Sequence, residues 1–269
     1  MMYRTLHAAG RAGPVPRQLV VLGQTVAVMA STSRSDLEVV ERGRSGQLVV
    51  FVHGVLDQGR SFGRVAAVLA GDCRMVWYDR RGYGASLRAS GAPVGVDGHV
   101  EDLLRVIDGR RAVVVGHSFG GVTVVGAALR APELVATAVL YETGMAWVPG
   151  WDDSHMRAVL SADDPAQAGV RMMFRERFDV MPADERAVRL VEGGAFVTEE
   201  RSVRTGTPPF DVAALRVPLV LDAATWASGH GFPRTWRRSP APKSWRFPAP
   251  DTTLTGPSPR RLLIWYGAA

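Results

Sequence analysis

A serine flanked by glycines is the feature of this sequence best suited to covalent chemistry. Ser118 is the centre of the segment 116–120, Gly-His-Ser-Phe-Gly, which fits the pattern Gly-x-Ser-x-Gly. The β-branched run 113–115 precedes it, and an apolar stretch with helical spacing, closed by Pro132, follows it. In a sharp strand-to-helix turn only small residues fit two positions before and after the serine, and the helix N-terminus stabilises developing negative charge. The motif therefore predicts an exposed hydroxyl at an anion-stabilising turn.

Short apolar runs alternate with amphipathic segments along the chain. The run 48–52 is continuously apolar, as a strand buried on both faces must be. We expect strands at 37–41, 48–52, 75–78, 113–115, 136–141 and 217–221, and helices at 62–70, at 100–107 and directly after Ser118. This alternation predicts an α/β fold, in which a mostly parallel central sheet is covered by helices on both faces.

Charge and cysteine content exclude several classes of function. The 269-residue chain has a formal net charge of +6, but residues 29–221 hold 22 Arg against 24 Asp plus Glu, so the excess lies in the two ends. Without a basic face on that central part, we expect no nucleic-acid partner. The single cysteine, Cys73, excludes a disulfide framework, and no apolar run is long enough for a transmembrane span. We expect no cofactor and no metal.

Three further regions complete the expected organisation. Residues 1–34 are expected to be a disordered extension, 35–221 the core, and 145–209 a helical cap within it. Residues 18–30 loosely resemble a signal peptide, but we favour the alternative that Met29 is the true start, which implies a cytoplasmic rather than a secreted protein. The aromatic and methionine side chains of the cap either pack the segment or line an apolar pocket. Without the cap, the core is expected to stay soluble.

Five segments in order give the chain a resemblance to the α/β-hydrolase superfamily over about residues 37–221. They are Phe-Val-His-Gly-Val at 51–55, Tyr-Asp-Arg-Arg-Gly-Tyr-Gly-Ala-Ser at 78–86, the serine motif, Leu-Tyr-Glu at 140–142 and Arg-Val-Pro-Leu-Val-Leu at 216–221. The resemblance implies that Ser118 is the nucleophile, as in the esterase and cofactor-free haloperoxidase-like branch. It also implies an oxyanion hole made by the backbone N–H groups of Val55 and Phe119, each contributing about 3 kcal/mol.

The resemblance leaves the acid and the base of a catalytic triad open. Glu142, after strand 136–141, is either the acid or a structural carboxylate that bonds loop amides, while Asp222 lacks the expected glycine-flanked loop. His53 and His117 resemble motif histidines that support loops rather than act as bases. The turn 79–84 is most often structural in the family, so we assign it no catalytic role. His230 is the only histidine beyond residue 155.

Two functions follow from these features. The first is a serine hydrolase that acts on a small-molecule ester, thioester or lactone through an acyl-enzyme on Ser118. Related dehalogenases and epoxide hydrolases carry an aspartate at this position, so the serine disfavours their chemistry. The second is a catalytically impaired or non-catalytic member of the fold, a small-molecule binder that lacks the triad histidine. The sequence does not indicate the substrate or the oligomeric state.

Residues 222–269 do not resemble the end of this fold. They contain the only lysine, four of the seven tryptophans and seven of the seventeen prolines. Read from the third base of each codon, residues 244–255 permit a Gly-x-Gly-His segment and residues 221–228 permit an acidic loop, both resembling those of the family. We therefore predict that a change of reading frame produced this tail, so that the last part of the fold is missing or scrambled. The alternative is a genuine Pro- and Arg-rich disordered tail.

Overall fold

The computed structural model describes residues 36–69, 71–91, 93–147 and 151–221, together with two short strands near the N-terminus. The chain divides between Arg34 and Ser35 into two units. In the first unit, β1 (Leu19–Val21) pairs antiparallel with β2 (Gln24–Val26). The tail 222–269, with Asp222 and His230, lies outside the described residues.

A six-stranded sheet with the order β3-β5-β4-β6-β7-β8 forms the second unit. Only β3 is antiparallel to its neighbour, and the remaining pairs are parallel. The strands are β3 (Val39–Arg42), β4 (Gln47–Val52), β5 (Cys73–Tyr78), β6 (Ala112–His117), β7 (Val135–Tyr141) and β8 (Leu219–Leu221). This arrangement confirms the predicted α/β fold with a mostly parallel sheet.

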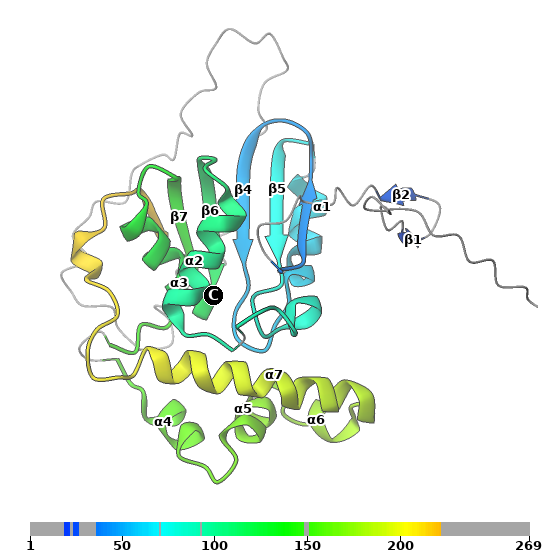
Figure 1. The fold of residues 1–269 in the computed structure, drawn as a ribbon, viewed down its shortest axis with the longest axis vertical. Helices are drawn as coiled ribbons and strands as arrows, with labels where there is room; N and C mark the ends of the chain where they lie inside the picture. The colour runs from blue at the N-terminus through cyan, green and yellow to red at the C-terminus, as the bar shows by residue number, and fades with distance from the viewer. Residues whose placement is uncertain are drawn as a thin grey trace, which may run out of the picture. The chain divides into compact units, whose positions relative to one another are not determined.

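Helices cover both faces of the sheet. Successive strand residues point to opposite sides, and on the central strands the residues of both sides are apolar. On β4, Val49 and Phe51 pack in one apolar cluster with Ala66 of α1, whereas Val50 and Val52 belong to a second cluster with α2 and α3. In Figure 1, α2 and α3 lie over the near face of the sheet. The helices are η1 (Gly59–Phe62), α1 (Gly63–Leu69), η2 (Gly84–Ser86), α2 (Val96–Ile107) and α3 (Phe119–Arg130).

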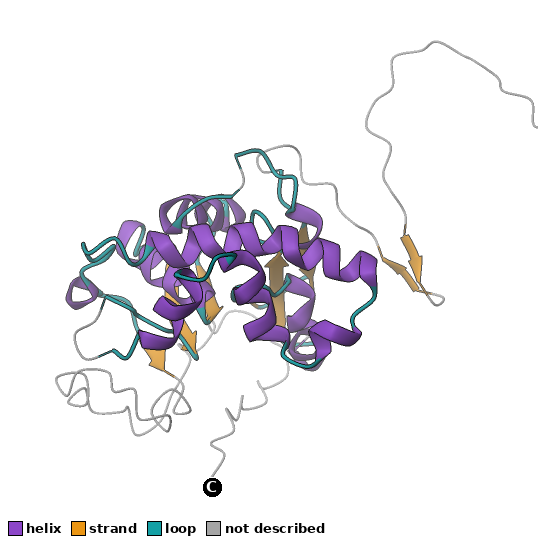
Figure 2. Ribbon diagram, turned by 90° about the horizontal axis from the view of Figure 1, so that it is seen from below, coloured by secondary structure: helices purple, strands orange, loops and turns teal. Residues whose placement is uncertain are grey.

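A helical segment follows β7 and crosses the end of the sheet to which the parallel strands point (Figure 1). It comprises α4 (Ser154–Leu160), α5 (Pro165–Phe174), α6 (Arg177–Val180) and α7 (Ala183–Ser202), and η3 (Val212–Ala214) then leads to β8. Figure 2 shows α7 extending across the strand ends as the longest of these helices. We call α4–α7 the helical segment. Among the helices that the structure describes, none has both the length and the apolar content needed to cross a bilayer.

The helical segment shares its apolar core with the sheet. Val170 of α5, Phe178 of α6 and Phe196 of α7 are buried in the same cluster as the β4 and β6 residues that face α2 and α3. Glycines permit close packing inside the segment, since a Cβ on Gly169 would collide with the Phe196 ring. The segment is therefore built onto the core as a continuous packed layer.

Candidate functional site

Ser118 occupies the turn between β6 and α3 in a backbone conformation that few non-glycine residues adopt. Its φ is 51° and its ψ is −123°, a strained region that is typical of functional turns. A Cβ on Gly116 would lie 2.5 Å from the Gly120 carbonyl oxygen, and a Cβ on Gly120 would collide with the Val52 carbonyl oxygen. The two glycines are therefore required by close backbone approach, for the reason expected from the sequence motif.

The loop after β4 lies directly against Ser118. Because β4 and β6 pair in parallel, with Val52 opposite Gly116, their carboxyl ends reach the same edge of the sheet. A Cβ on Gly54 would lie only 3.0 Å from the Ser118 Cβ. A side chain at position 54 would therefore crowd the serine.

The backbone N–H groups of Val55 and Phe119 lie in the turns that follow β4 and β6. Val55 and Phe119 are both buried, with relative exposures of 5% and 4%. In the part of the chain that the structure describes, no acceptor lies in hydrogen-bond geometry with either N–H. The Phe119 N–H is also the first of α3, where helix donors are unpaired and the helix dipole favours negative charge.

His53 supports the loop after β4. Its ring is fully buried, and its Nε2 accepts the backbone N–H of Arg80 at 2.8 Å. The proton therefore resides on Nδ1, which donates to the Gly54 carbonyl at 2.8 Å. Burial, reinforced by the charge of Arg80, holds the pKa of His53 well below its usual value. This histidine is neutral and fully engaged with the backbone.

His117 and Glu142 form a pair beside the serine. Nε2 of His117 lies 3.4 Å from Oε2 of Glu142, and both side chains are partly exposed to solvent. The His117 ring also packs against Tyr141, with the ring centroids 5.3 Å apart. Glu142 thus lies next to the residue that precedes Ser118, which is compatible with either of the two roles expected for it.

Among the histidines that the structure describes, none forms the hydrogen bond with Ser118 that the base of a catalytic triad would form. His53 bonds backbone groups, His99 lies against Glu199, and His117 lies against Glu142. His155 is exposed on α4. The predicted candidate His230 lies outside the described residues, as does Asp222, so their roles stay predictions.

Arg80 is a buried residue of the site that the sequence analysis missed. Its guanidinium donates from Nε to the His53 carbonyl at 2.9 Å and from Nη2 to the Gly54 carbonyl at 3.0 Å. Its counter-charge is Glu199 of α7, with Nη1 and Oε1 2.6 Å apart. The sequence offered a weak signal, an arginine inside the turn 79–84, but gave no indication of its partner.

Glu199 is completely buried and carries several polar contacts. Tyr83 Oη donates to its Oε2 at 2.8 Å, and His99 Nε2 lies 2.6 Å from its Oε1 without the alignment of a hydrogen bond. Burial alone would raise the pKa of Glu199, but the charge of Arg80 and the contacts with His99 outweigh it and lower the pKa. Burial lowers the pKa of His99 despite the neighbouring carboxylate. The arrangement is a buried ion pair of Arg80 and Glu199 beside a histidine whose pKa is held below its usual value.

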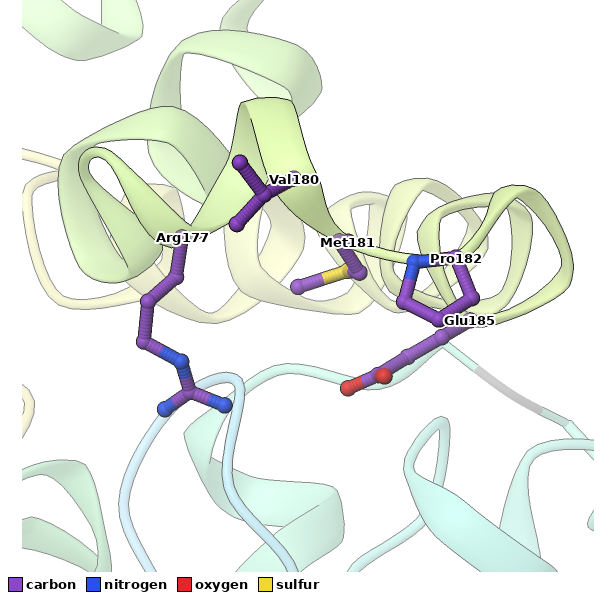
Figure 3. Close-up of a pocket in the computed structure, with 5 residues that line it drawn as sticks. All are labelled: Arg177, Val180, Met181, Pro182 and Glu185. Atoms are coloured by element: carbon purple, nitrogen blue, oxygen red, sulfur yellow. The ribbon is translucent and has the colours of Figure 1, made fainter.

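A separate depression lies on the helical segment. Its volume is about 150 Å³. Figure 3 shows the residues that line it, Arg177, Val180, Met181, Pro182 and Glu185. These residues come from α6, from the connection 181–182 and from the first turn of α7, whereas the serine turn lies between β6 and α3, so we assign the depression no role at Ser118. Across the described ranges, no group of three His, Cys, Asp or Glu side chains is placed to hold a metal ion.

Comparison with known proteins identifies the family. The model of the alpha/beta hydrolase family matches residues 49–267. The chain therefore belongs to the alpha/beta hydrolase family. The match extends past residue 221, where the resemblance based on motifs ends, into the tail for which we predict a change of reading frame. That prediction remains to be tested on the gene.

Individual relatives include a lipase. Lipase LipV of Mycobacterium tuberculosis is 34% identical over 175 residues, which are 59% of this chain and 64% of that protein. A human serine hydrolase-like protein is 34% identical over 102 residues, covering 36% of this chain and 50% of that protein. The chain thus spans less than two thirds of the length of these curated relatives.

Solved structures show the same fold. A hydrolase from Pseudomonas aeruginosa PA01 has a TM-score of 0.52 and 23% identity, covering 72% of this chain and 77% of the other. An epoxide hydrolase from Bacillus megaterium has a TM-score of 0.53 and 18% identity, covering 70% and 80%. At these identities the likeness extends to the fold alone.

Proposed function

We propose that this chain is a serine hydrolase in which Ser118 attacks the carbonyl carbon of a small carboxylic ester, thioester or lactone. The observation that carries the proposal is the strained conformation of Ser118, held where Gly116 and Gly120 leave no room for a side chain. Such strain persists only where the surrounding structure over-determines it, and it is common at catalytic sites. It lifts the hydroxyl to the edge of the sheet, where a substrate can reach it.

The proposed reaction passes through an acyl-enzyme. The Ser118 oxygen bonds to the carbonyl carbon, and the N–H groups of Val55 and Phe119 stabilise the oxyanion that forms. Collapse of this intermediate breaks the bond from the carbonyl carbon to the alcohol or thiol leaving group, which takes up the proton that the base removed from the serine; from a lactone, the new hydroxyl stays on the acyl chain. Water then hydrolyses the acyl-enzyme and releases the acid and Ser118. A base must take the serine proton during attack. His230 is the candidate for this base from the sequence, and Glu142 the candidate for its acid partner.

The comparisons support acyl chemistry over the alternatives of the fold. The relatives named as a lipase and a serine hydrolase-like protein favour a serine nucleophile. The structural similarity to an epoxide hydrolase does not argue for epoxide hydrolysis by this chain, because the identity is only 18% and this chain has serine at position 118. The helical segment, which crosses the strand ends, is the proposed cap over the substrate.

One observation favours a second function, a catalytically impaired member of the family. Each described histidine near the sheet edge contacts a group other than Ser118. Without a base, a serine hydrolase retains the oxyanion hole and substrate binding, which still give roughly 10³- to 10⁴-fold catalysis over water. The two functions thus differ in rate rather than in the location of the site.

Hydrolysis assays distinguish the two functions. Wild type and Ser118→Ala are compared on p-nitrophenyl esters of increasing chain length, on a thioester and on a lactone. The proposed hydrolase turns over at least one of these substrates, and Ser118→Ala reduces that rate to the residual level that the oxyanion hole and substrate binding alone support. A folded wild-type protein that is no faster than Ser118→Ala on every substrate would favour the impaired form.

A further inference from the structure

The Gly54–Val55 peptide is held from its carbonyl side by two buried donors. Arg80 Nη2 lies 3.0 Å and His53 Nδ1 lies 2.8 Å from the Gly54 oxygen. A trans peptide is planar, and its C=O and N–H point in opposite directions. Fixing the Gly54 carbonyl therefore also fixes the direction of the Val55 N–H.

Arg80 in turn is held by a carboxylate of the helical segment. Its Nη1 and Nη2 lie 2.6 and 3.1 Å from the two Glu199 oxygens, and both side chains are completely buried. The guanidinium is planar, so this two-point contact also orients the nitrogens that bond the His53 and Gly54 carbonyls. A buried guanidinium without a counter-charge is strongly disfavoured. The placement of Arg80 under the loop therefore depends on Glu199.

We propose that Glu199 is a positioning residue for the oxyanion site: through Arg80 it holds the Gly54–Val55 peptide so that the Val55 N–H is available beside Ser118. This inference rests on the proposed function, because it concerns the same site. In this proposal α7 not only covers the edge of the sheet that carries Ser118 but also holds the oxyanion site in position. A displacement of α7 would then weaken oxyanion stabilisation without moving Ser118.

Glu192 provides a matched control on the same helix. It lies two turns before Glu199, is also completely buried, and accepts hydrogen bonds from Gln58 Nε2 at 3.1 Å and from the Gly84 N–H at 2.9 Å. Its ion pair is with Arg189. Glu199→Gln and Glu192→Gln thus make the same chemical change on one helix, and only the first reaches the Gly54 carbonyl through an arginine.

The peptide itself can be observed by NMR. The chain has four Gly-Val dipeptides, at 54–55, 95–96, 121–122 and 169–170, so protein with ¹³C-carbonyl glycine and ¹⁵N-valine gives four correlated signals. In Glu199→Gln we expect the Gly54 carbonyl signal to move upfield as its hydrogen bond from Arg80 weakens, with a shift of the Val55 amide. In Glu192→Gln both signals stay at their wild-type positions. Unchanged signals in Glu199→Gln, or equal shifts in both variants, would overturn the proposal.

The rate at which Ser118 reacts with a fluorophosphonate tests whether Glu199 affects oxyanion stabilisation. Loss of one oxyanion donor costs about 10²- to 10³-fold in rate, so a misaligned donor in Glu199→Gln should slow reaction of Ser118 with a fluorophosphonate by about tenfold relative to Glu192→Gln. Equal rates in the two folded variants would contradict the inference. If the wild type reacts no more than Ser118→Ala, the proposed function fails, and the NMR comparison still decides whether Glu199 positions the peptide.

Discussion

Arg80 and Glu199 form an ion pair in which both side chains are completely buried, although the residues lie 119 positions apart in the chain. The pair joins the turn after β5 to α7. Arg80 also bonds the two carbonyls of the loop that lies against Ser118. The helical segment is thus anchored to the sheet by a charge pair as well as by a shared apolar core.

Removing one partner of this pair should destabilise the protein strongly. We expect Arg80→Met to lower the free energy of unfolding by about 3 to 5 kcal/mol, because it leaves Glu199 buried without a counter-charge. Arg80→Met combined with Glu199→Leu should recover much of that loss. Urea denaturation of the four proteins of this cycle gives the coupling energy. As a control, Arg130→Met removes a solvent-exposed pair with Asp97 and should cost less than about 1 kcal/mol. Additive effects of the two buried changes would contradict the account.

The glycines of the serine turn should tolerate no side chain. Gly116→Val and Gly120→Val place atoms against the backbone of Gly120 and of Val52, respectively, so we expect little folded protein and no reaction of Ser118 with a fluorophosphonate. Gly194→Ala in α7 is the contrasting change, because its Cβ meets nothing within 4 Å. It should raise the stability of the folded protein by about 0.5 to 1 kcal/mol. Circular dichroism and thermal unfolding measure both effects. Wild-type folding and labelling in the two valine variants would contradict the claim that the turn leaves no room for a side chain at positions 116 and 120.

Stability should fall as the pH is lowered through the ordinary range of histidine. Burial lowers the pKa values of His53 and His99 in the folded protein, whereas in the unfolded chain both bind protons below a pH of about 6.5. Between that pH and the lower folded pKa values, the unfolded state holds more protons. The free energy of unfolding therefore decreases with falling pH, by up to about 1.4 kcal/mol per pH unit for each histidine.

A matched pair of variants isolates the contribution of His99. Denaturation curves between pH 7 and pH 5 should show a smaller slope of stability against pH in His99→Gln than in wild type. His155→Gln, which changes a solvent-exposed histidine of α4, should retain the wild-type slope. If His99→Gln also retains that slope, His99 is protonated in the folded protein and the account of its burial is wrong.

The sheet and the serine turn could be predicted because their signals are local. The apolar run of β4 identifies a strand buried on both faces, and the glycines at 116 and 120 are required by contacts within one turn and its neighbouring strand. The order of the motifs then identified the family. Val55 and Phe119 could be named as candidates only through the resemblance to the family. In the structure, the loop after β4 and the serine turn follow adjacent parallel strands.

The contacts of α7 could not be predicted, because they join distant parts of the chain. Glu192 and Glu199 resemble ordinary surface charges in sequence, yet both are completely buried. In the sequence, Pro149, Pro165 and Pro182 indicate a series of short helices, whereas α7 runs for 20 residues after Pro182. Because the segment supplies both Phe196 of the main core and the partner of Arg80, the expectation that the core stays soluble without it loses its physical support.

The reading-frame hypothesis makes a prediction about the gene rather than the protein. In the third-base frame, the codons for residues 222–269 should encode an acidic loop and, 27 positions later, the histidine of a Gly-x-Gly-His segment. Sequencing the gene and its neighbourhood checks this directly. A stop codon in that frame, or the absence of the histidine codon, would contradict the hypothesis and leave residues 222–269 as a genuine tail.

The most direct test of the account is whether Ser118 reacts as a nucleophile. The folded wild-type protein, Ser118→Ala and Ser154→Ala, which removes an exposed serine of α4, are each incubated with a fluorophosphonate. Intact-mass spectrometry and peptide mapping then locate the adduct. The account predicts one adduct in wild type and in Ser154→Ala, on the peptide that contains Ser118, and none in Ser118→Ala. An adduct that persists in Ser118→Ala, or no adduct in folded wild type, would contradict it.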